Sequence, residues 1–285
     1  MKILLAGATG AIGRRLVPLL IAAGHEVTGT TRHADRTDFI AVTGAKPLIM
    51  NALERGSVFS ALQSAQPDVV IHQLTDLTGR DFAANSRLRT EGGRNLVDAA
   101  RACGVDRLIA QSIAWVCCAG DRPATEDDPL DLDAPDPRGQ TVKTVKALED
   151  AVAELPGGVV LRYGLLYGPG TWYARDGLTT EQVRAGALTA TDGVSSFVHV
   201  EDAAQAALVA LTWAPGVYNI VDDEPAAGVD WLSSYAQLIG APPPPVEHQR
   251  AEWERGVSNA KAHALGWNPR YPSWREGFQR ELGTS

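Results

Sequence analysis

Short aliphatic runs alternate with longer stretches of helical periodicity through the first half of the chain. Runs of this kind, without polar alternation, are typical of parallel strands buried on both faces of a sheet. The expected strands are Lys2–Ala6, Glu26–Thr30, Asp68–His72 and Arg107–Gln111. Helices are expected at Ala11–Ala23 and Gly92–Cys103. The pattern predicts an α/β fold with a Rossmann-like, doubly wound parallel sheet.

The second half of the chain continues this alternation after a loop rich in Asp and Pro, which we expect at Gly120–Gly139. The further helices are predicted at Thr141–Leu155, Glu201–Leu211 and around Trp274–Leu282, and the further strands at Gly158–Arg162, Phe197–Val200 and Val217–Val221. The same sheet can therefore extend through the middle of the sequence, with smaller elements at the C-terminal end.

Composition narrows the function classes. The formal net charge is −8 and no run of Lys and Arg forms a basic stripe, so we do not expect binding to nucleic acid or to an anionic membrane. Cys103, Cys117 and Cys118 lack Cys-x-x-Cys spacing and a His cluster, which indicates neither a disulfide framework nor a metal site. No apolar run approaches the ~20 residues of a membrane span, and the apolar start leads into a glycine motif, not a cleavage site. We expect a cytoplasmic protein.

A glycine-rich turn follows the first expected strand and opens the first expected helix. Glycines let the backbone turn sharply and approach a pyrophosphate, and the helix N-terminus offers unpaired N–H groups to the phosphates. This placement favours a dinucleotide site over a purely structural turn. The residues predicted to bind the cofactor here are Gly7, Thr9, Gly10, Ala11, Ile12 and Gly13.

The end of the second strand indicates which dinucleotide is bound. An NAD-binding Rossmann unit usually carries Asp or Glu there, about 20 residues beyond the glycines, to hold the ribose 2′-hydroxyl. Here the sequence reads Thr30-Thr31-Arg32. An Arg guanidinium can bind a 2′-phosphate with charge-assisted hydrogen bonds. Thr31 and Arg32 therefore favour NADPH/NADP, the alternative being that Arg32 is a solvated surface arginine.

Several blocks in the same order along nearly the whole chain resemble extended short-chain dehydrogenase/reductases, often called NAD-dependent epimerase/dehydratases. The blocks are Gly7–Gly13, Asp68–His72, Arg162–Gly170, Phe197–Asp202, Gly216–Ile220, Ser258–Lys261 and Leu265–Pro269. The resemblance implies a Rossmann domain from 1–164 and 197–221, interlocked with a small C-terminal substrate-binding region from 165–196 and 222–285. It also implies that the chain can form a homodimer.

The resemblance assigns further cofactor contacts. It places Asn51, followed by Ala52 and Leu53, near the adenine. Gln73, Leu74 and Thr75 would run beside the ribose and nicotinamide. The nicotinamide side would be lined by Ser112, Tyr163, Gly164, Leu165 and Leu166. His199 and Asp202 are expected to be structural.

The family's proton relay is altered in this sequence. The usual Tyr-x-x-x-Lys lies four residues before a helical Glu, and counting back from Glu149 puts Val145 at the Lys position and Thr141 at the Tyr position. Arg89 stands at the Asn position, and Ser112 is followed by Ile113 where the family has a Ser pair. No catalytic residue is assured, and the candidates are Ser112, Thr75 and Thr141.

Three functions follow. The first is an NADPH-dependent ketoreductase in which the substrate supplies the proton, because a well-placed substrate hydroxyl can have an effective molarity of about 10⁵–10⁸ M. The others are an NADP(H)-binding sensor or scaffold without turnover, and a nucleotide-sugar epimerase/dehydratase.

The altered relay and the segment Ser112–Cys117 are similar to the angucyclinone ketoreductases of aromatic-polyketide pathways such as simocyclinone biosynthesis. That resemblance implies secondary metabolism and a polycyclic aromatic ketone as substrate. The aromatic residues predicted to contact the substrate are Trp115, Trp172 and Tyr173.

Overall fold

The computed structural model describes residues 1–76 and 81–283. The chain divides into two compact units. The first comprises Met1–Ser112, Leu132–Leu161 and Ala204–Val217. The second comprises Ile113–Asp131, Arg162–Ala203 and Tyr218–Ser285.

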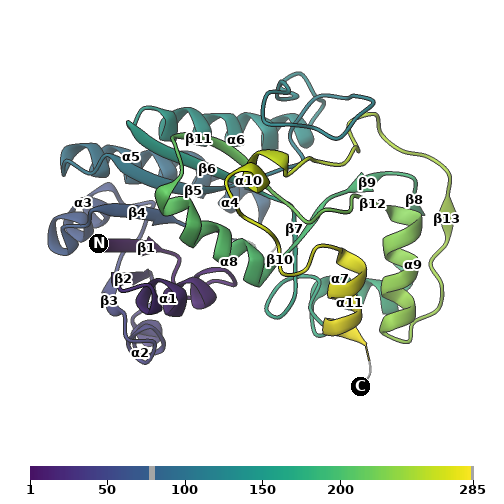
Figure 1. The fold of residues 1–285 in the computed structure, drawn as a ribbon, viewed down its shortest axis with the longest axis horizontal. Coiled ribbons are helices and arrows are strands. Elements are labelled where there is room, and N and C mark those ends of the chain that lie inside the picture. The colour runs from purple at the N-terminus through teal and green to yellow at the C-terminus, as the bar shows by residue number, and fades with distance from the viewer. Residues whose placement is uncertain (77–80, 284–285) are drawn as a thin grey trace. The chain divides into compact units, whose positions relative to one another are not determined.

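The main sheet has seven strands in the order β11-β6-β5-β4-β1-β2-β3 (Figure 1). In that order the strands are Gly216–Ile220, Gly157–Tyr163, Arg107–Ile113, Val69–His72, Lys2–Ala6, Glu26–Thr31 and Lys46–Ile49. The ladders joining β5, β4, β1, β2 and β3 are all parallel. Strand β1 lies between β4 and β2, and the chain order reverses between β1 and β4, which is the doubly wound Rossmann arrangement. The predicted fold class is confirmed.

The central strands are buried because both of their faces are covered. Ile3 through Ala6 and Val69 through His72 are buried at every position. Side chains alternate between the faces of a strand, so runs of apolar residues are needed where both faces are covered. Strand β3 lies at the sheet edge, includes Pro47 and is only partly buried, which explains why its residues carry no strong strand signal.

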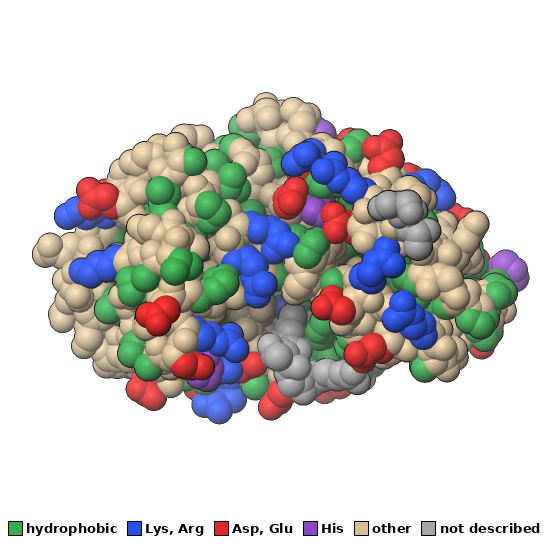
Figure 2. All heavy atoms as spheres, turned by 90° about the horizontal axis from the view of Figure 1, so that it is seen from below, with side chains coloured by type: hydrophobic (Ala, Val, Ile, Leu, Met, Phe, Trp, Pro, Cys, Tyr) green, Lys and Arg blue, Asp and Glu red, His purple; other side chains and the backbone are tan. Residues whose placement is uncertain are grey.

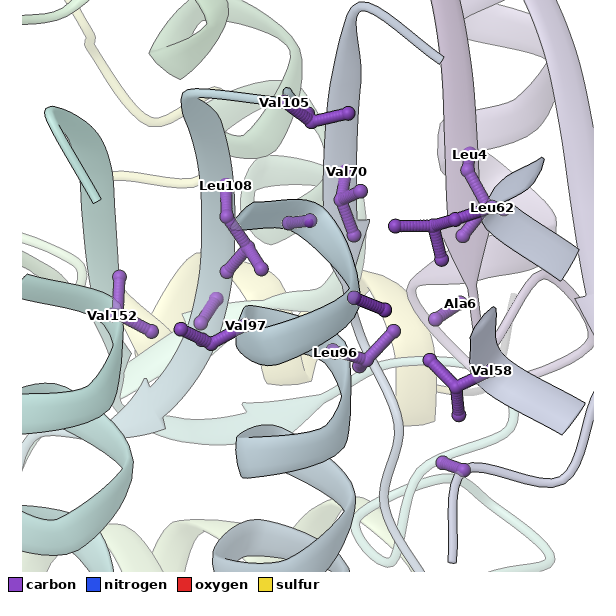
Figure 3. Close-up of a cluster of buried hydrophobic side chains, with 14 of the residues drawn as sticks. Leu4, Ala6, Val58, Leu62, Val70, Leu96, Val97, Val105, Leu108 and Val152 are labelled. Atoms are coloured by element: carbon purple, nitrogen blue, oxygen red, sulfur yellow. The ribbon is translucent and has the colours of Figure 1, made fainter. Parts of the chain in front are cut away.

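One face of the sheet packs on three helices, α3 (Arg55–Ala65), α5 (Gly93–Ala102) and α6 (Arg138–Ala153). Figure 3 shows Leu62 and Val58 of α3 and Leu96 and Val97 of α5 among Leu4, Val70 and Leu108 of the strands. A Cβ on Gly93 would lie 2.5 Å from Leu148 Cδ1, so glycine allows α5 and α6 to approach closely. This unit also contains α1 (Gly13–Ala22), α2 (Thr37–Ala41), α4 (Phe82–Arg87), a π-helical turn, Leu88–Gly92, and the 3₁₀ turns Ala34–Arg36 and Ala210–Thr212.

The second unit is built from short strand pairs and helices. Strands β7 (Leu165–Tyr167) and β10 (Phe197–His199) are parallel, and two further pairs join β9 (Val194–Ser195) to β12 (Ala226–Ala227) and β8 (Ala190–Thr191) to β13 (Val246–Glu247). The helices are α7 (Leu178–Arg184), α9 (Gly228–Leu238), α10 (Ala260–Ala264) and α11 (Trp274–Leu282), while α8 (Val200–Val209) leads back to the first unit.

The core of the second unit is aromatic. Phe197, Tyr235 and Phe278 are fully buried, and the ring centroids of Phe197 and Phe278 lie 5.2 Å apart in an edge arrangement. Asp202, which the sequence indicated as structural, accepts hydrogen bonds from the backbone N–H groups of Arg270 (2.8 Å) and Tyr271 (3.1 Å). These bonds fix the segment that precedes α11.

The ends of the predicted elements agree with the structure within two residues, except that α6 begins at Arg138, three residues before the predicted start at Thr141. On the face shown in Figure 2, Lys and Arg side chains are interspersed with Asp and Glu side chains.

In the two described ranges we find no helix with both the length and the apolar character of a membrane span.

Candidate functional site

The turn between β1 and α1 forms a cradle of bare backbone. Gly7 has a φ of +95°, and a Cβ there would lie 2.8 Å from the carbonyl oxygen of Gln73. A Cβ on Gly13 would lie 2.1 Å from the carbonyl oxygen of Gly7. Gly10 N–H donates to Gly7 O (3.1 Å), and the first turn of α1 carries no acidic residue. The turn therefore requires glycine and presents a helix N-terminus that suits a phosphate.

Strand β2 ends at the residues predicted to select the cofactor. Thr31 is buried, whereas Arg32 is exposed beyond it. Arg32 Nη1 lies 3.0 Å from Asp76 Oδ2, and the Arg32 side chain is 54% exposed. An exposed pair of this kind contributes little to stability. The guanidinium is thus available to exchange Asp76 for another anion.

The residues predicted near the adenine shape the entry of α3. Asn51 Oδ1 accepts the N–H of Leu53 (3.2 Å), and its Nδ2 donates to Glu54 Oε1 (2.8 Å). Ala52 is buried and its carbonyl accepts from Asn95 Nδ2 of α5 (2.9 Å). These hydrogen bonds order the loop that carries the residues predicted to contact the adenine.

The exits of β4 and β5 are tied together. Gln73 N–H donates to Ala6 O (2.8 Å), and Gln111 Nε2 donates to Leu74 O (3.0 Å). Gln111 was not singled out in the sequence, although its place at the end of a buried strand is a usable signal. Thr75 is exposed next to this framework. The structure thus brings Gly7 and Gln73 together at the carboxyl edge of the sheet, where Rossmann folds bind their ligands.

The candidate hydroxyls near α6 have partners of their own. Ser112 is fully buried and donates to Glu149 Oε1 (2.8 Å). Thr141 Oγ1 donates to the carbonyl of Pro137 (3.2 Å), and Val145 is fully buried. Valine has no ionisable group, so the position assigned to Lys cannot contribute a charge. The assignment of relay positions rests on sequence and stays a prediction.

The remaining predicted contacts belong to the second unit. Tyr163 is buried with its hydroxyl donating to Ala203 O (3.3 Å), and a Cβ on Gly164 would lie 2.5 Å from the carbonyl oxygen of Ser196. Leu165 and Leu166 of β7 are half-buried, as are Trp115 and Trp172. Their roles toward cofactor and substrate stay predictions.

Tyr173 packs into the aromatic core. Its ring lies 5.3 Å from that of Phe197 and 5.8 Å from that of Trp231, both in edge arrangements. Burial raises the pKa of the Tyr173 hydroxyl, so the group stays protonated at neutral pH. The Tyr173 ring is therefore packed on several sides by aromatic residues of its own unit.

Residues 3–221 match the family described as NAD dependent epimerase/dehydratase. The chain belongs to this family. The family assignment agrees with the glycine cradle and with the strand order, both of which are required to hold a dinucleotide.

Two curated proteins of Streptomyces are similar to the chain. A 3-diazoavenalumate denitrifying reductase of Streptomyces sp. is 46% identical over 309 aligned residues, which cover 99% of this chain and 100% of that protein. A dTDP-4-dehydrorhamnose reductase of Streptomyces griseus is 33% identical over 174 residues, 59% of this chain and 50% of that protein.

Solved structures share the fold. The UDP-glucose 4-epimerase of Thermus thermophilus, in complex with NAD, has a TM-score of 0.78 and 26% identity, covering 99% of this chain and 98% of that one. Bordetella bronchiseptica WbmG, in complex with NAD, has a TM-score of 0.81 at 22% identity, covering 99% and 93%. The chain is an NAD(P)-dependent oxidoreductase, which sets aside the sensor or scaffold without turnover.

The residues of this chain fit NAD(P). A Cβ on Gly7 or Gly13 would collide with backbone atoms, so only glycine allows the tight turn from which the N-terminus of α1 begins. When bound, NAD(P)H supplies a hydride to the substrate. The described residues contain no group of three or more His, Cys, Asp or Glu side chains arranged to hold a metal ion.

Proposed function

We propose that this chain is an NADPH-dependent reductase that replaces the dinitrogen of an aromatic diazo compound with hydrogen. The observation that carries the proposal is the 46% identity, over essentially the whole of both chains, to the 3-diazoavenalumate denitrifying reductase. By its name, that relative is a reductase that removes nitrogen from a diazo compound, and its substrate is an anion.

The chemistry of this reaction needs no proton donor. An arenediazonium ion accepts a hydride at the carbon that carries nitrogen. A C–H bond forms, the C–N bond breaks, and the electrons of that bond leave with N₂. The reduced cofactor loses the hydride and becomes oxidised, so charges and electrons balance without a proton. Reduction of a ketone to an alcohol, in contrast, takes up one proton as well as the hydride.

The altered relay supports a reaction of this kind. Thr141 and Val145 stand at the positions assigned to Tyr and Lys, and the hydroxyl of Ser112 donates to Glu149. Loss of a positioned general acid typically costs about 10²–10⁴ in rate, where the reaction needs one. Reduction at a diazo carbon needs no general acid, so the altered relay does not slow it.

A second candidate is the reduction of a polycyclic aromatic ketone of the angucyclinone type. It is favoured by the sequence resemblance to such ketoreductases and by the half-buried indole of Trp172, which suits a flat ligand. A hydroxyl next to the ketone would then supply the proton. Interconversion of nucleotide sugars is the third activity to test, since the family includes epimerases.

The deciding experiment offers the purified chain NADPH deuterated at the transferable position together with 3-diazo-4-hydroxycinnamate. We expect release of N₂ and one deuterium at the carbon that carried nitrogen. A hydroxylated polycyclic ketone and a UDP-sugar serve as parallel substrates. Turnover of the ketone alone, or sugar interconversion without net consumption of cofactor, would replace the proposal by the corresponding alternative.

Substitution of the three candidate hydroxyls should change turnover only modestly. We expect Ser112→Ala, Thr75→Ala and Thr141→Val each to lower kcat by less than ~10²-fold, because no proton has to be delivered. Thermal unfolding separates a folding effect of Ser112→Ala, which leaves Glu149 without one donor. One variant that abolishes turnover while it still binds NADPH would identify a protein acid and contradict this expectation.

The preference for NADPH rests on Arg32. A contact between its guanidinium and the 2′-phosphate should contribute about 1.5–3 kcal/mol, so Arg32→Ala should weaken NADP⁺ binding roughly 10- to 100-fold and leave NAD⁺ binding unchanged. Asp76→Asn should strengthen NADP⁺ binding, because Arg32 loses its competing partner. Arg101→Ala, which removes an exposed arginine of α5 paired with Glu154, is the matched control. Equal affinity of the wild type for both nucleotides contradicts the assignment.

A further inference from the structure

Arg89 is a buried cation in an unusual position. It lies on the π-helical turn Leu88–Gly92, and its residue surface is only 7% exposed. Its Nε is buried and makes no hydrogen bond, and no carboxylate among the described residues pairs with the guanidinium. The sequence marked Arg89 only as a departure at the family's Asn position. An arginine in a helix ordinarily indicates a solvated surface, so its burial could not be read from the pattern.

The charge of Arg89 persists in this environment. Burial lowers the pKa of its guanidinium to about 10, which still leaves it protonated at neutral pH. Burying a charge without a partner is costly, and such groups normally occur where an opposite charge or a ligand meets them. The folded chain therefore carries an unmatched positive charge in its first unit.

His72 adds a second unmatched donor next to Arg89. This histidine ends β4 and is fully buried. Burial, and after it the charge of Arg89, lowers the pKa of His72 to about 4, so the ring is neutral at neutral pH. Its Nδ1 accepts the N–H of Leu74 (3.1 Å), which leaves the proton on Nε2. That Nε2 is buried without a hydrogen-bond partner among the described residues.

His72 and Arg89 lie on the side of the sheet that packs on α3, α5 and α6. His72 has the same orientation on β4 as Val70, which packs on α3 and α5. The cluster around Val70 includes no side chain of α1, the helix that opens the glycine cradle. Arg89 immediately precedes α5 on the same side. His72 and Arg89 therefore belong to a side-chain layer that contains no residue of α1, and the titration of NADP⁺ below tests whether they bind a different anion.

We propose that Arg89 and His72 bind the carboxylate of an aromatic acid substrate. Two buried donors without acceptors need an acceptor, and an oxygen anion satisfies both at once. The identity of the anion as substrate rests on the proposed reduction of an aromatic acid. The same chemistry could come from a cofactor phosphate, and the test below distinguishes the two sources.

Binding of 4-hydroxycinnamate and of its methyl ester, measured by calorimetry with saturating NADP⁺, tests the proposal. We expect the wild type to bind the acid at least ~10-fold more tightly than the ester, the value typical of a hydrogen bond to a charged group. Arg89→Gln should remove this preference, and Arg89→Lys should retain part of it. The control is Arg94→Gln, which removes a half-buried arginine of α5 that pairs with Glu154. This variant should keep the preference for the acid over the ester.

Separate titration of NADP⁺ identifies the source of the anion. Affinity for NADP⁺ should be the same in Arg89→Gln and wild type. A loss of NADP⁺ affinity equal to the loss of acid affinity would assign Arg89 to the cofactor and overturn the proposal, as would equal binding of acid and ester by the wild type.

Thermal unfolding of the ligand-free protein keeps the proposal testable if a variant binds poorly. Arg89→Met removes a buried unpaired charge, so its Tm should rise, whereas that of Arg94→Gln should fall because an ion pair is lost. A fall in the Tm of Arg89→Met would reveal a structural role and overturn the proposal.

Binding needs no turnover, so a preference for the acid without reduction of the diazo compound would refute the proposed function alone. Reduction without that preference would refute this inference alone.

Discussion

Gly13→Ala should weaken NADP⁺ binding by about 100-fold or more. Its Cβ would lie 2.1 Å from the carbonyl oxygen of Gly7 and 2.8 Å from Ala8 Cα, both backbone atoms that cannot rotate away. The turn must therefore shift, and the N–H groups at the start of α1 no longer point toward the pyrophosphate. Two lost charge-assisted hydrogen bonds at about 1.5–3 kcal/mol each correspond to at least ~100-fold weaker NADP⁺ binding. Titration by calorimetry or by quenching of tryptophan fluorescence measures the loss.

Two further variants separate cofactor binding from folding. A Cβ on Gly10 would lie 3.3 Å from the carbonyl oxygen of Gly7, a contact that a small adjustment relieves. Gly10→Ala should therefore keep the Tm of the ligand-free protein while it weakens NADP⁺ binding. Gly56→Ala, on α3 with no atom within 4 Å of the added Cβ, should change neither. Wild-type affinity in Gly13→Ala would refute the cradle as the phosphate site.

The fold could be predicted from sequence because its signals are local and periodic. The buried runs that became β1 and β4 are continuous apolar stretches, and the glycine turn stands directly between a strand and a helix. In contrast, the paired strands β8 and β13 contain two residues each and lie more than 50 residues apart. Such pairs carry no periodicity, so only tertiary structure defines them.

The candidate site could be predicted only in part, because sequence does not give side-chain direction. Ser112 was one of three candidate catalytic residues, and in the structure its hydroxyl donates to Glu149 of α6. Tyr173 was predicted to contact the substrate, which stays a prediction, whereas its packing on Phe197 and Phe278 was not predicted because these residues are distant in sequence. Arg89 is of a residue type that usually lies on the surface, but in this fold it is buried. Each of these outcomes depends on contacts between distant segments.

Alkaline pH should destabilise the protein through Asp222. This residue follows β11 and is 2% exposed, with its backbone N–H donating to Phe197 O (2.7 Å). Burial raises the pKa of its carboxyl from the ordinary value of 3.8 to about 9, while the backbone N–H groups of Glu224 and Trp274 oppose the shift. The folded state thus holds a proton that the unfolded chain releases.

The sign of the pH dependence follows from this proton. The stabilising contribution is fully present below about pH 4, the pKa of the unfolded chain, and is lost progressively as the pH rises toward about 9. Since one pKa unit corresponds to about 1.4 kcal/mol, a shift from 3.8 to about 9 corresponds to at most about 7 kcal/mol across that range. The free energy of unfolding, measured by urea titration from pH 5 to pH 9, should therefore decrease steeply in the wild type.

Asp222→Asn should flatten this decrease, because a neutral amide neither gains nor loses the proton. The variant should unfold at a higher temperature than the wild type at pH 9 and at a similar temperature at pH 5. Asp176→Asn, which changes an exposed carboxylate of the same unit, is the matched control and should leave the slope unchanged. A wild-type slope in Asp222→Asn would show that Asp222 is ionised in the folded protein, so that its charge is accommodated by the N–H groups of Glu224 and Trp274.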